Sequence, residues 1–327
     1  MFLLPARARV AALAGLLWCG ACSSDPDGGV DDIQPPDELY DGPLQYRSLV
    51  QYENFPFEDF PVLMYMPEDP VAVVWLFHGT NGSVGFAKKI ETIATSNELI
   101  GAGFGVIATE SDDRVNGKWS TDDSNPATSS ELGRLFRLRD EVIATTDMTQ
   151  DTPSYTVGFS GGGSMATHFT KVLRDQGIPY RAAHANCSSG RADGAGDIPI
   201  IWSIAVNDPQ QFAEDTHESR VASGFPSELY HVQEVPIDSM FFTKNPSMDE
   251  GRSRKAHDEM VRLQLIDDTG ERIVPIEEAE NWLSTYEREA DVPSASLRTE
   301  EIRVGWAMHR MNGTHARKIR DFFLAHL

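Results

Sequence analysis

The residues with the clearest chemical potential form the segment Gly-Phe-Ser-Gly-Gly at residues 158–162. An apolar run at 155–159 leads into it and a helix-like pattern follows, so the order is strand, tight turn and helix. Glycines two positions before and after Ser160 leave space where a Cβ atom would collide. The serine hydroxyl would then lie beside the free N–H groups of a helix N-terminus. We therefore predict that Ser160 is a nucleophile.

A serine hydroxyl reacts only with help from a base, an acid that orients the base, and donors for the developing oxyanion. On a strand–turn–helix scaffold of this kind, the acid and the histidine follow the serine in that order along the chain. The buried-type run at 199–206 ends in Asn207-Asp208-Pro209. We predict Asp208 as the acid, with Asp193 and Asp238 as alternatives.

The base should be a histidine near the C-terminus. His309 directly follows the run at 304–308 and leaves a loop before the last predicted helix. His315 would fall in the first turn of that helix, where its ring is less free to reach the serine. We favour His309 and keep His315 as the alternative, because His326 is too close to the end of the chain.

Backbone N–H groups can supply the oxyanion hole. One belongs to Gly161, directly after the nucleophile. The other should come from the loop His-Gly-Thr-Asn-Gly at 78–82, which follows the apolar run 71–77. Thr80 is the favoured donor and Asn81 the alternative. We assign His78 a structural hydrogen-bonding role.

A polar loop at residues 110–114, followed by Trp119, comes after another predicted strand, at the sheet edge where ligands bind in α/β proteins. It is either a solvated loop or part of the substrate pocket. On the second interpretation, Asn81, Ser111 and Trp119 contact the substrate. Histidine and carboxylate spacings elsewhere offer no strong metal-ligand cluster, and we expect no metal and no cofactor.

Apolar runs alternate with helical patterns from residue 46 onward, which predicts a mostly parallel sheet with helices on both faces. Predicted strands are 46–52, 61–66, 71–77, 104–108, 155–159, 182–186, 198–206 and 228–235; predicted helices are 86–99, 130–143, 165–176, 210–222 and 314–326. Residues 239–300 break the alternation, with helical patterns at 253–265 and 276–288. They form either a helical insertion, or cap, or a continuation of the outer helical layer. Residues 300–308 fit a strand or a helix.

The sequences Leu-Phe-His-Gly at 76–79 and Gly-Phe-Ser-Gly-Gly-Gly-Ser-Met-Ala at 158–166 resemble the α/β-hydrolase superfamily over residues 46–327. They are most similar to the secreted polyhydroxyalkanoate depolymerase and feruloyl esterase branch, which usually has Asn where this chain has Gly161. The resemblance implies an α/β-hydrolase fold and a serine esterase that forms an acyl-serine intermediate on a small-molecule or polymeric ester. A serine peptidase on the same fold, or a binding lipoprotein that has lost its base, are the alternatives.

The N-terminal sequence and the net charge indicate where the protein is located and which partners are excluded. Residues 1–22 read as an export signal that ends in Cys-Gly-Ala-Cys, which resembles a bacterial lipobox with Cys22 as the lipidated residue; free secretion is the alternative. Residues 23–45 are acidic and rich in proline and glycine, as expected of a disordered tether. The net charge of −22 argues against nucleic acid as a partner. With the signal removed and Cys22 lipidated, Cys187 has no cysteine partner in the mature chain, so we expect no disulfide. We expect contact with the membrane only through the lipid anchor.

Overall fold

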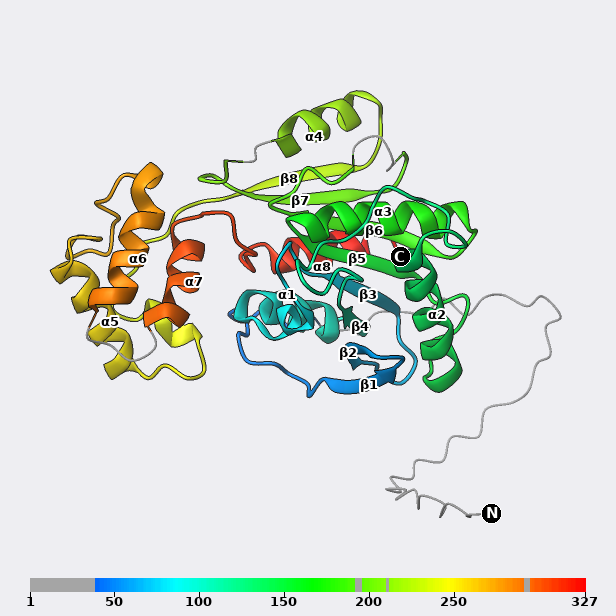
Figure 1. Ribbon diagram of the computed structural model, residues 1–327, viewed down its shortest axis with the longest axis horizontal. Helices are drawn as coiled ribbons and strands as arrows, with labels where there is room; N and C mark the ends of the chain where they lie inside the picture. Colours follow the sequence, from blue (N-terminus) through cyan, green and yellow to red (C-terminus); the bar gives the residue numbers. More distant parts are fainter. Residues whose placement is uncertain (1–38, 192–195, 210–211, 291–294) are drawn as a thin grey trace, which may run out of the picture. The chain divides into compact units, whose positions relative to one another are not determined.

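A mixed sheet with the strand order β1-β2-β4-β3-β5-β6-β7-β8 forms the centre of the molecule (Figure 1). The computed structural model describes residues 39–191, 196–209, 212–290 and 295–327. The strands are β1 (Glu53–Phe57), β2 (Phe60–Tyr65), β3 (Ala72–Phe77), β4 (Phe104–Thr109), β5 (Ser154–Phe159), β6 (Tyr180–Asn186), β7 (Ile200–Ala205) and β8 (Ser227–Val232). β2 pairs antiparallel with β1 and β4, and the pairs from β4 to β8 are parallel.

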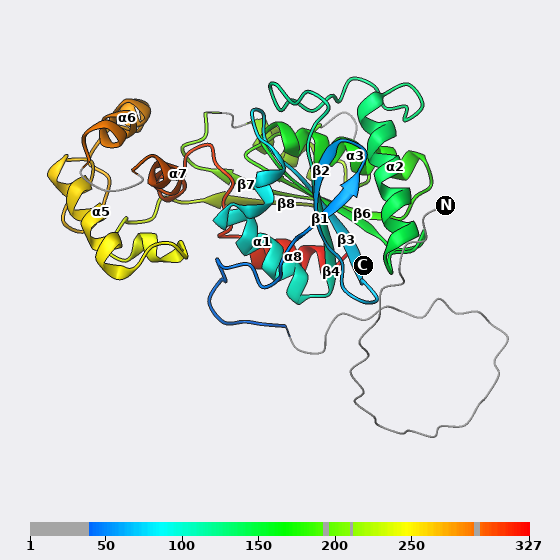
Figure 2. The ribbon, with the colours of Figure 1, turned by 60° about the horizontal axis from the view of Figure 1, so that its bottom comes forward.

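Helices cover both faces of this sheet (Figure 2). The helices that follow the strands are α1 (Ile90–Gly101), α2 (Ser130–Thr145), α3 (Gly161–Asp175), α4 (Phe212–Ala222) and α8 (Ala316–Leu324). Successive side chains of a strand point to opposite faces. In β3, Val74 and Leu76 pack in the cluster that includes α1 and α8, whereas Trp75 and Phe77 pack in the cluster that includes α2 and α3. Burial on both faces explains why this strand is apolar throughout.

The strand order, the parallel run from β4 to β8 and the strand–turn–helix at residue 160 make this an α/β-hydrolase fold. The predicted fold class is therefore confirmed. The predicted strands from residue 61 onward agree with β2 to β8 within a few residues at their ends.

A group of helices between β8 and α8 has a hydrophobic cluster of its own. It consists of η2 (Phe241–Lys244), α5 (Glu250–Arg262), η3 (Ile276–Glu278), α6 (Ala279–Glu289) and α7 (Ala295–Gly305). Phe242, Met260, Leu283 and Trp306 are buried together in this cluster, and Figure 1 shows α5, α6 and α7 grouped around one another. Such packing favours an insertion over a continuation of the outer layer. The ambiguous residues 300–308 belong to α7 up to its end at Gly305.

The N-terminal part of the sheet differs from the prediction. Residues 46–52 are not a strand, and β1 begins at Glu53. It forms a hairpin with β2 in which Phe57 pairs with Phe60 and Glu58 has a φ of 47°. β1 contains Pro56, which is tolerated because β1 lies at the edge of the sheet.

The expected helix at 86–99 is divided in two. A 3-10 helix, η1 (Val84–Lys88), precedes α1, and Lys89 between them has an extended backbone. No helix in the described part of the chain is long and apolar enough to cross a membrane. The predicted signal at 1–22, most of the predicted tether, Cys22 and Asp193 lie outside the described residues.

Candidate active site

The predicted nucleophile lies in a sharp turn between β5 and α3. Ser160 has φ 53° and ψ −122°, a backbone conformation that residues other than glycine rarely adopt. A Cβ atom added at Gly158 would lie 2.0 Å from the carbonyl oxygen of Gly162, and one added at Gly162 would lie 2.1 Å from that of Phe77. The two glycines of the motif are therefore required by the close approach of backbone to backbone.

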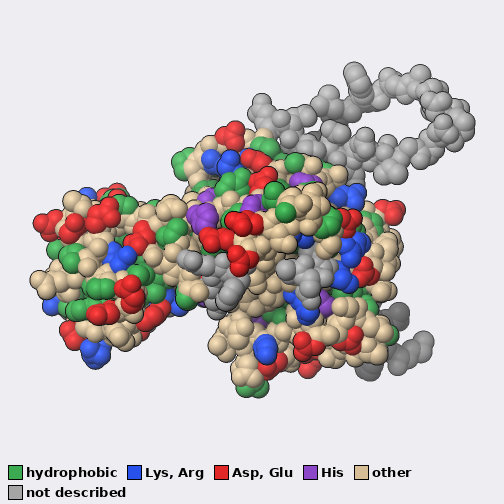
Figure 3. Space-filling model, turned by 90° about the horizontal axis from the view of Figure 1, so that it is seen from above, with side chains coloured by type: hydrophobic (Ala, Val, Ile, Leu, Met, Phe, Trp, Pro, Cys, Tyr) green, Lys and Arg blue, Asp and Glu red, His purple; other side chains and the backbone are tan. Residues whose placement is uncertain are grey.

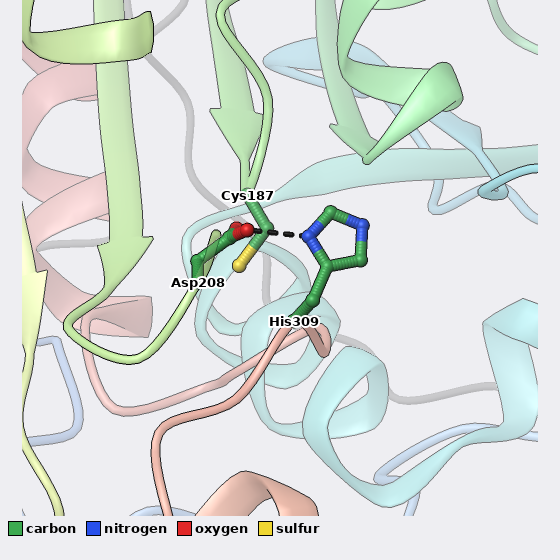
Figure 4. A group of neighbouring side chains, drawn as sticks. All are labelled: Cys187, Asp208 and His309. Carbon is green, nitrogen blue, oxygen red and sulfur yellow. Dashed lines mark hydrogen bonds and ion pairs between the residues drawn. The ribbon is translucent and has the colours of Figure 1, made fainter. Parts of the chain in front are cut away.

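The structure brings Ser160, Asp208 and His309 together. His309 Nε2 lies 2.9 Å from Ser160 Oγ, and His309 Nδ1 lies 2.8 Å from Asp208 Oδ2. Figure 4 shows the Asp208 carboxylate facing the imidazole. The side chain of Asp208 has no exposed surface and that of His309 is 23% exposed. Because a carboxylate only accepts, Nδ1 donates to Asp208 and leaves Nε2 free to accept the serine proton.

A hydrogen-bond network links the loop that carries the acid to the loop that carries the histidine. Asn207 Nδ2 donates to the carbonyl oxygen of Trp306 (2.8 Å) and to Glu234 Oε1 (2.6 Å), and the Asn207 N–H donates to the carbonyl oxygen of Ala307 (3.0 Å). Arg272, from the insertion, donates to both oxygens of Glu234. Hydrogen bonds with Arg272 and Asn207 lower the pKa of Glu234 against the effect of burial. We did not predict this network from the sequence.

The alternative acid and base lie elsewhere. Asp238 is exposed, and its Oδ1 accepts from the N–H of Met240 in a local turn. The ring of His315 lies 5.2 Å from that of Tyr230, and its Nδ1 has no hydrogen-bond partner among the described residues. Burial is the main cause that lowers the pKa of His315. The geometry therefore favours Asp208 and His309 for the triad.

The two predicted oxyanion donors lie side by side. A Cβ atom added at Gly161 would be 2.8 Å from Thr80 Oγ1 and 3.6 Å from the Thr80 nitrogen. Gly161 is the first residue of α3, and the first N–H groups of a helix have no intrahelical acceptor. The N–H of the alternative donor, Asn81, is already donated to the carbonyl oxygen of Asn116 at 2.7 Å. This occupied N–H favours Thr80 over Asn81.

Hydrogen bonds connect His78, in the loop that carries Thr80, to the loop at 110–114 and to Trp119. The Ser111 N–H donates to His78 Nε2 at 3.3 Å, so His78 Nδ1 carries the proton and donates to the carbonyl oxygen of Gly79 at 2.9 Å. Trp119 Nε1 donates to the carbonyl oxygen of His78 at 2.8 Å. Burial lowers the pKa of His78, which favours its neutral form.

The predicted substrate contacts divide into two kinds. Asn81 is exposed and lines the cleft described below. Ser111 and Trp119 are buried and are not among the residues that line the cleft, and Trp119 packs edge-on against Phe77. Their contact with substrate stays a prediction. They hold the loop that carries Thr80. The sequence places them after a strand, but their burial depends on packing between distant segments.

Cys187 lies behind the acid. Its Sγ, a carboxylate oxygen of Asp208 and a ring nitrogen of His309 all lie within 4.8 Å of one another (Figure 4). Thiol, carboxylate and imidazole groups all occur as metal ligands, but zinc binds a cysteine as the thiolate and a histidine as the neutral imidazole. Burial and the Asp208 carboxylate raise the pKa of the Cys187 thiol. A bound cation would have to remove that proton and break the hydrogen bond between Asp208 and His309, so the arrangement suits a triad better than a metal centre.

A cleft beside the triad has two connected parts. The larger, of about 600 Å³, runs along the loop at 78–85 and includes Thr80 and Asn81. The smaller, of about 80 Å³, lies between η1, α1 and α7. Both parts share five lining residues, namely Phe86, Lys89, Phe159, Glu300 and Arg310. Phe159 directly precedes the predicted nucleophile and Arg310 directly follows the predicted base, so the cleft adjoins both.

The charge of the cleft differs from that of the surface as a whole. Seen from the side of α4, acidic and histidine side chains lie next to one another (Figure 3). On this side, His231 Nε2 lies 3.6 Å from a carboxylate oxygen of Glu214. In the larger part of the cleft, by contrast, Lys89 and Arg310 face a single acid, Glu300, whereas Glu91 and Glu301 also line the smaller part. An anionic molecule would therefore meet less repulsion in the larger part of the cleft than on this surface.

Comparisons with known proteins found similarity to solved structures at low sequence identity. No family model matches the sequence, and no curated protein matches it. Among solved structures, it is similar to an arylesterase (16% identity, 55% of this chain and 75% of the other, TM-score 0.40). It is also similar to a bacterial heroin esterase (14%, 53% and 70%, TM-score 0.39) and to a lipase in its open form (14%, 53% and 85%, TM-score 0.40). At these TM-scores the functional argument rests on the site itself.

Proposed function

We propose that this protein is a serine hydrolase that cleaves carboxylic esters through an acyl-serine intermediate. The observation that carries the proposal is the continuous hydrogen-bonded chain from Asp208 through His309 to Ser160, with separations of 2.8 and 2.9 Å. A nucleophile, a base and an orienting acid at these distances are the arrangement that acyl transfer requires.

In the proposed reaction, Ser160 Oγ attacks the ester carbonyl while His309 Nε2 takes its proton. The buried carboxylate of Asp208 stabilises the imidazolium that forms. The N–H groups of Gly161 and Thr80 receive the negative charge that develops on the carbonyl oxygen. His309 then gives its proton to the leaving alcohol, and the same groups activate water to hydrolyse the acyl-serine. No step requires a metal or cofactor.

A fluorophosphonate probe and a p-nitrophenyl ester test the proposal together. The wild-type protein should be labelled and should turn over the ester, and Ser160→Ala should abolish both. His309→Ala should lower kcat by at least about 10³-fold, since removal of one triad member leaves only the binding and oxyanion contributions. His315→Ala is the matched control and should keep activity within about threefold. Loss of turnover in His315→Ala alone would contradict the assignment of the base.

The same experiment separates the alternative functions. A folded wild-type protein that is neither labelled nor active would favour a binding protein on this scaffold. Labelling combined with cleavage of aminoacyl p-nitroanilides, and no ester turnover, would favour a serine peptidase. For the esterase, the structural support is a cleft that combines the predicted oxyanion loop with an apolar chamber.

We also propose that the protein is exported and anchored by a lipid on Cys22, with residues 23–45 as the tether. The support is the apolar and small-residue pattern at 10–22. A diacylated cysteine contains enough buried methylene for stable anchoring. The partners that follow from the proposal are an ester substrate and, through the anchor alone, a membrane.

A further inference from the structure

The smaller part of the cleft is an apolar chamber. Its apolar lining consists of Phe86, Ile90, Phe159, Val304 and Met311, which come from η1, α1, β5, α7 and the loop after His309. The rings of Phe86 and Phe159 stack with centroids 6.4 Å apart. α7 belongs to the insertion, so the insertion supplies one wall of the chamber.

The chamber begins next to the base. The ring of Phe159 lies 5.2 Å from that of His309, and Phe159 is bonded to the predicted nucleophile. A group attached to the carbonyl carbon at Ser160 would therefore meet the Phe159 wall first. The leaving group can occupy the larger part of the cleft along the loop that carries Thr80.

The volume of the chamber limits what it can hold. A dry cavity of about 150 Å³ accommodates benzene, which has six carbon atoms. In proportion, a chamber of about 80 Å³ accommodates about three or four carbon atoms. With the carbonyl carbon outside the chamber, this corresponds to acyl groups up to about butyryl or valeryl.

Charged groups flank the apolar part of the chamber, and three of them, Lys89, Glu300 and Arg310, lie where it meets the larger part of the cleft. Arg310 Nε donates to Glu300 Oε2 at 2.8 Å, and Lys89 Nζ lies 4.0 Å from the same oxygen. On another side, Glu91 is buried and pairs with Lys244 at 2.8 Å. A longer alkyl chain would have to displace the buried Glu91–Lys244 pair or leave it without water, which is costly.

We propose that this chamber is the acyl subsite and that it restricts the enzyme to esters of short acids of about two to five carbons. The inference rests on the proposed ester hydrolysis, because it assigns the smaller part of the cleft to the acyl group. Val304 determines the chain length, since it is half-buried on α7 and forms part of the apolar wall.

The experiment measures kcat/KM for p-nitrophenyl acetate, butyrate and octanoate. Each buried methylene adds severalfold to transition-state binding, so butyrate should exceed acetate by on the order of tenfold. Octanoate should fall at least about tenfold below butyrate. If octanoate equals or exceeds butyrate, the size limit is wrong, although ester hydrolysis itself would stand.

Variants of Val304 test the wall directly. Val304→Phe should lower kcat/KM for butyrate by about tenfold and leave acetate within about threefold, whereas Val304→Ala should raise octanoate relative to butyrate. Val221→Phe, on the exposed surface of α4, is the matched control and should leave the profile unchanged. Equal loss of acetate and butyrate in Val304→Phe would overturn the inference.

A second series keeps the acetyl group and lengthens the alcohol from methyl to hexyl. If Val304→Phe changes the preference for the alcohol instead of the acid, the chamber is on the leaving-group side and the proposal is wrong. No turnover of any ester by folded protein, together with no fluorophosphonate labelling, would overturn the proposed function as well. The two failures therefore give different results.

Discussion

Asp208→Asn is the substitution that tests the proposed triad most sharply. The asparagine has the same size as the aspartate, and the side chain it replaces has no exposed surface, so the loop should keep its conformation. Two effects then act on His309. The amide can donate to Nδ1, which places the proton on Nε2 and prevents that nitrogen from accepting the serine proton. The imidazolium also loses its charged partner.

The magnitude follows from the geometry. For a hydrogen bond of 2.8 Å, the centres of charge of the carboxylate and the imidazolium are about 4 Å apart. At an effective dielectric constant of about 20, two charges at about 4 Å attract by about 4 kcal/mol. This energy corresponds to about 10³-fold in rate. With the wrong tautomer in addition, we expect kcat to fall by about 10³- to 10⁴-fold.

The assay is kcat on p-nitrophenyl butyrate, with circular dichroism and the melting temperature as controls for folding. Asp215→Asn, at an exposed position of α4, is the matched control and should keep full activity. KM should change little, because Asp208 acts on the base and does not contact the substrate. A folded Asp208→Asn protein that loses less than about tenfold in kcat would refute the reasoning.

Three further predictions concern the network beside the acid, a buried carboxyl group and the proposed lipid anchor. Asn207→Ala should lower the free energy of unfolding by about 2 to 4 kcal/mol in urea denaturation, because it removes hydrogen bonds to Glu234 and to the carbonyl of Trp306; unchanged stability would contradict this. Burial raises the pKa of the Glu301 carboxyl group. The free energy of unfolding of the wild type is therefore highest below the ordinary carboxyl pKa and falls as the pH rises through the raised value. Glu301→Gln should gain about 1 kcal/mol of stability at pH 8 and nothing at pH 4. Cys22→Ala should abolish incorporation of labelled palmitate and release the protein from membranes, and retained labelling would contradict the assignment of the anchor.

Much of the fold could be predicted because its signals are local. The apolar run of β3 reflects burial on both faces of a parallel sheet. The glycine spacing around Ser160 reflects contacts with backbone atoms only a few residues away or in the adjacent strand. The turn after β7, where the Asp208 N–H donates to the carbonyl oxygen of Ala205, follows from a buried run that ends in Asn-Asp-Pro.

Features that depend on distant segments could not be predicted. Trp119 is an aromatic residue shortly after a strand, as a pocket residue would be, but contacts with Phe77 and His78 bury it. The bond between Asn207 and Trp306 joins residues 99 positions apart, and nothing near Asn207 indicates it. For the same reason, the choice between two late histidines required knowledge of where each ring lies relative to Ser160.

Backbone hydrogen bonds hold the two ends of the insertion close together. The Val235 N–H donates to the carbonyl oxygen of Gly305 at 2.8 Å, and the Asn207 N–H donates to that of Ala307 at 3.0 Å. The first bond closes about seventy residues into a loop whose two ends leave and re-enter the sheet domain at one point. Changes in this segment that keep Arg272 bonded to Glu234 can therefore alter one wall of the cleft while the acid and the base stay in place. Chimaeras that exchange the segment between Val235 and Gly305 would therefore change one wall of the cleft and leave the sheet intact.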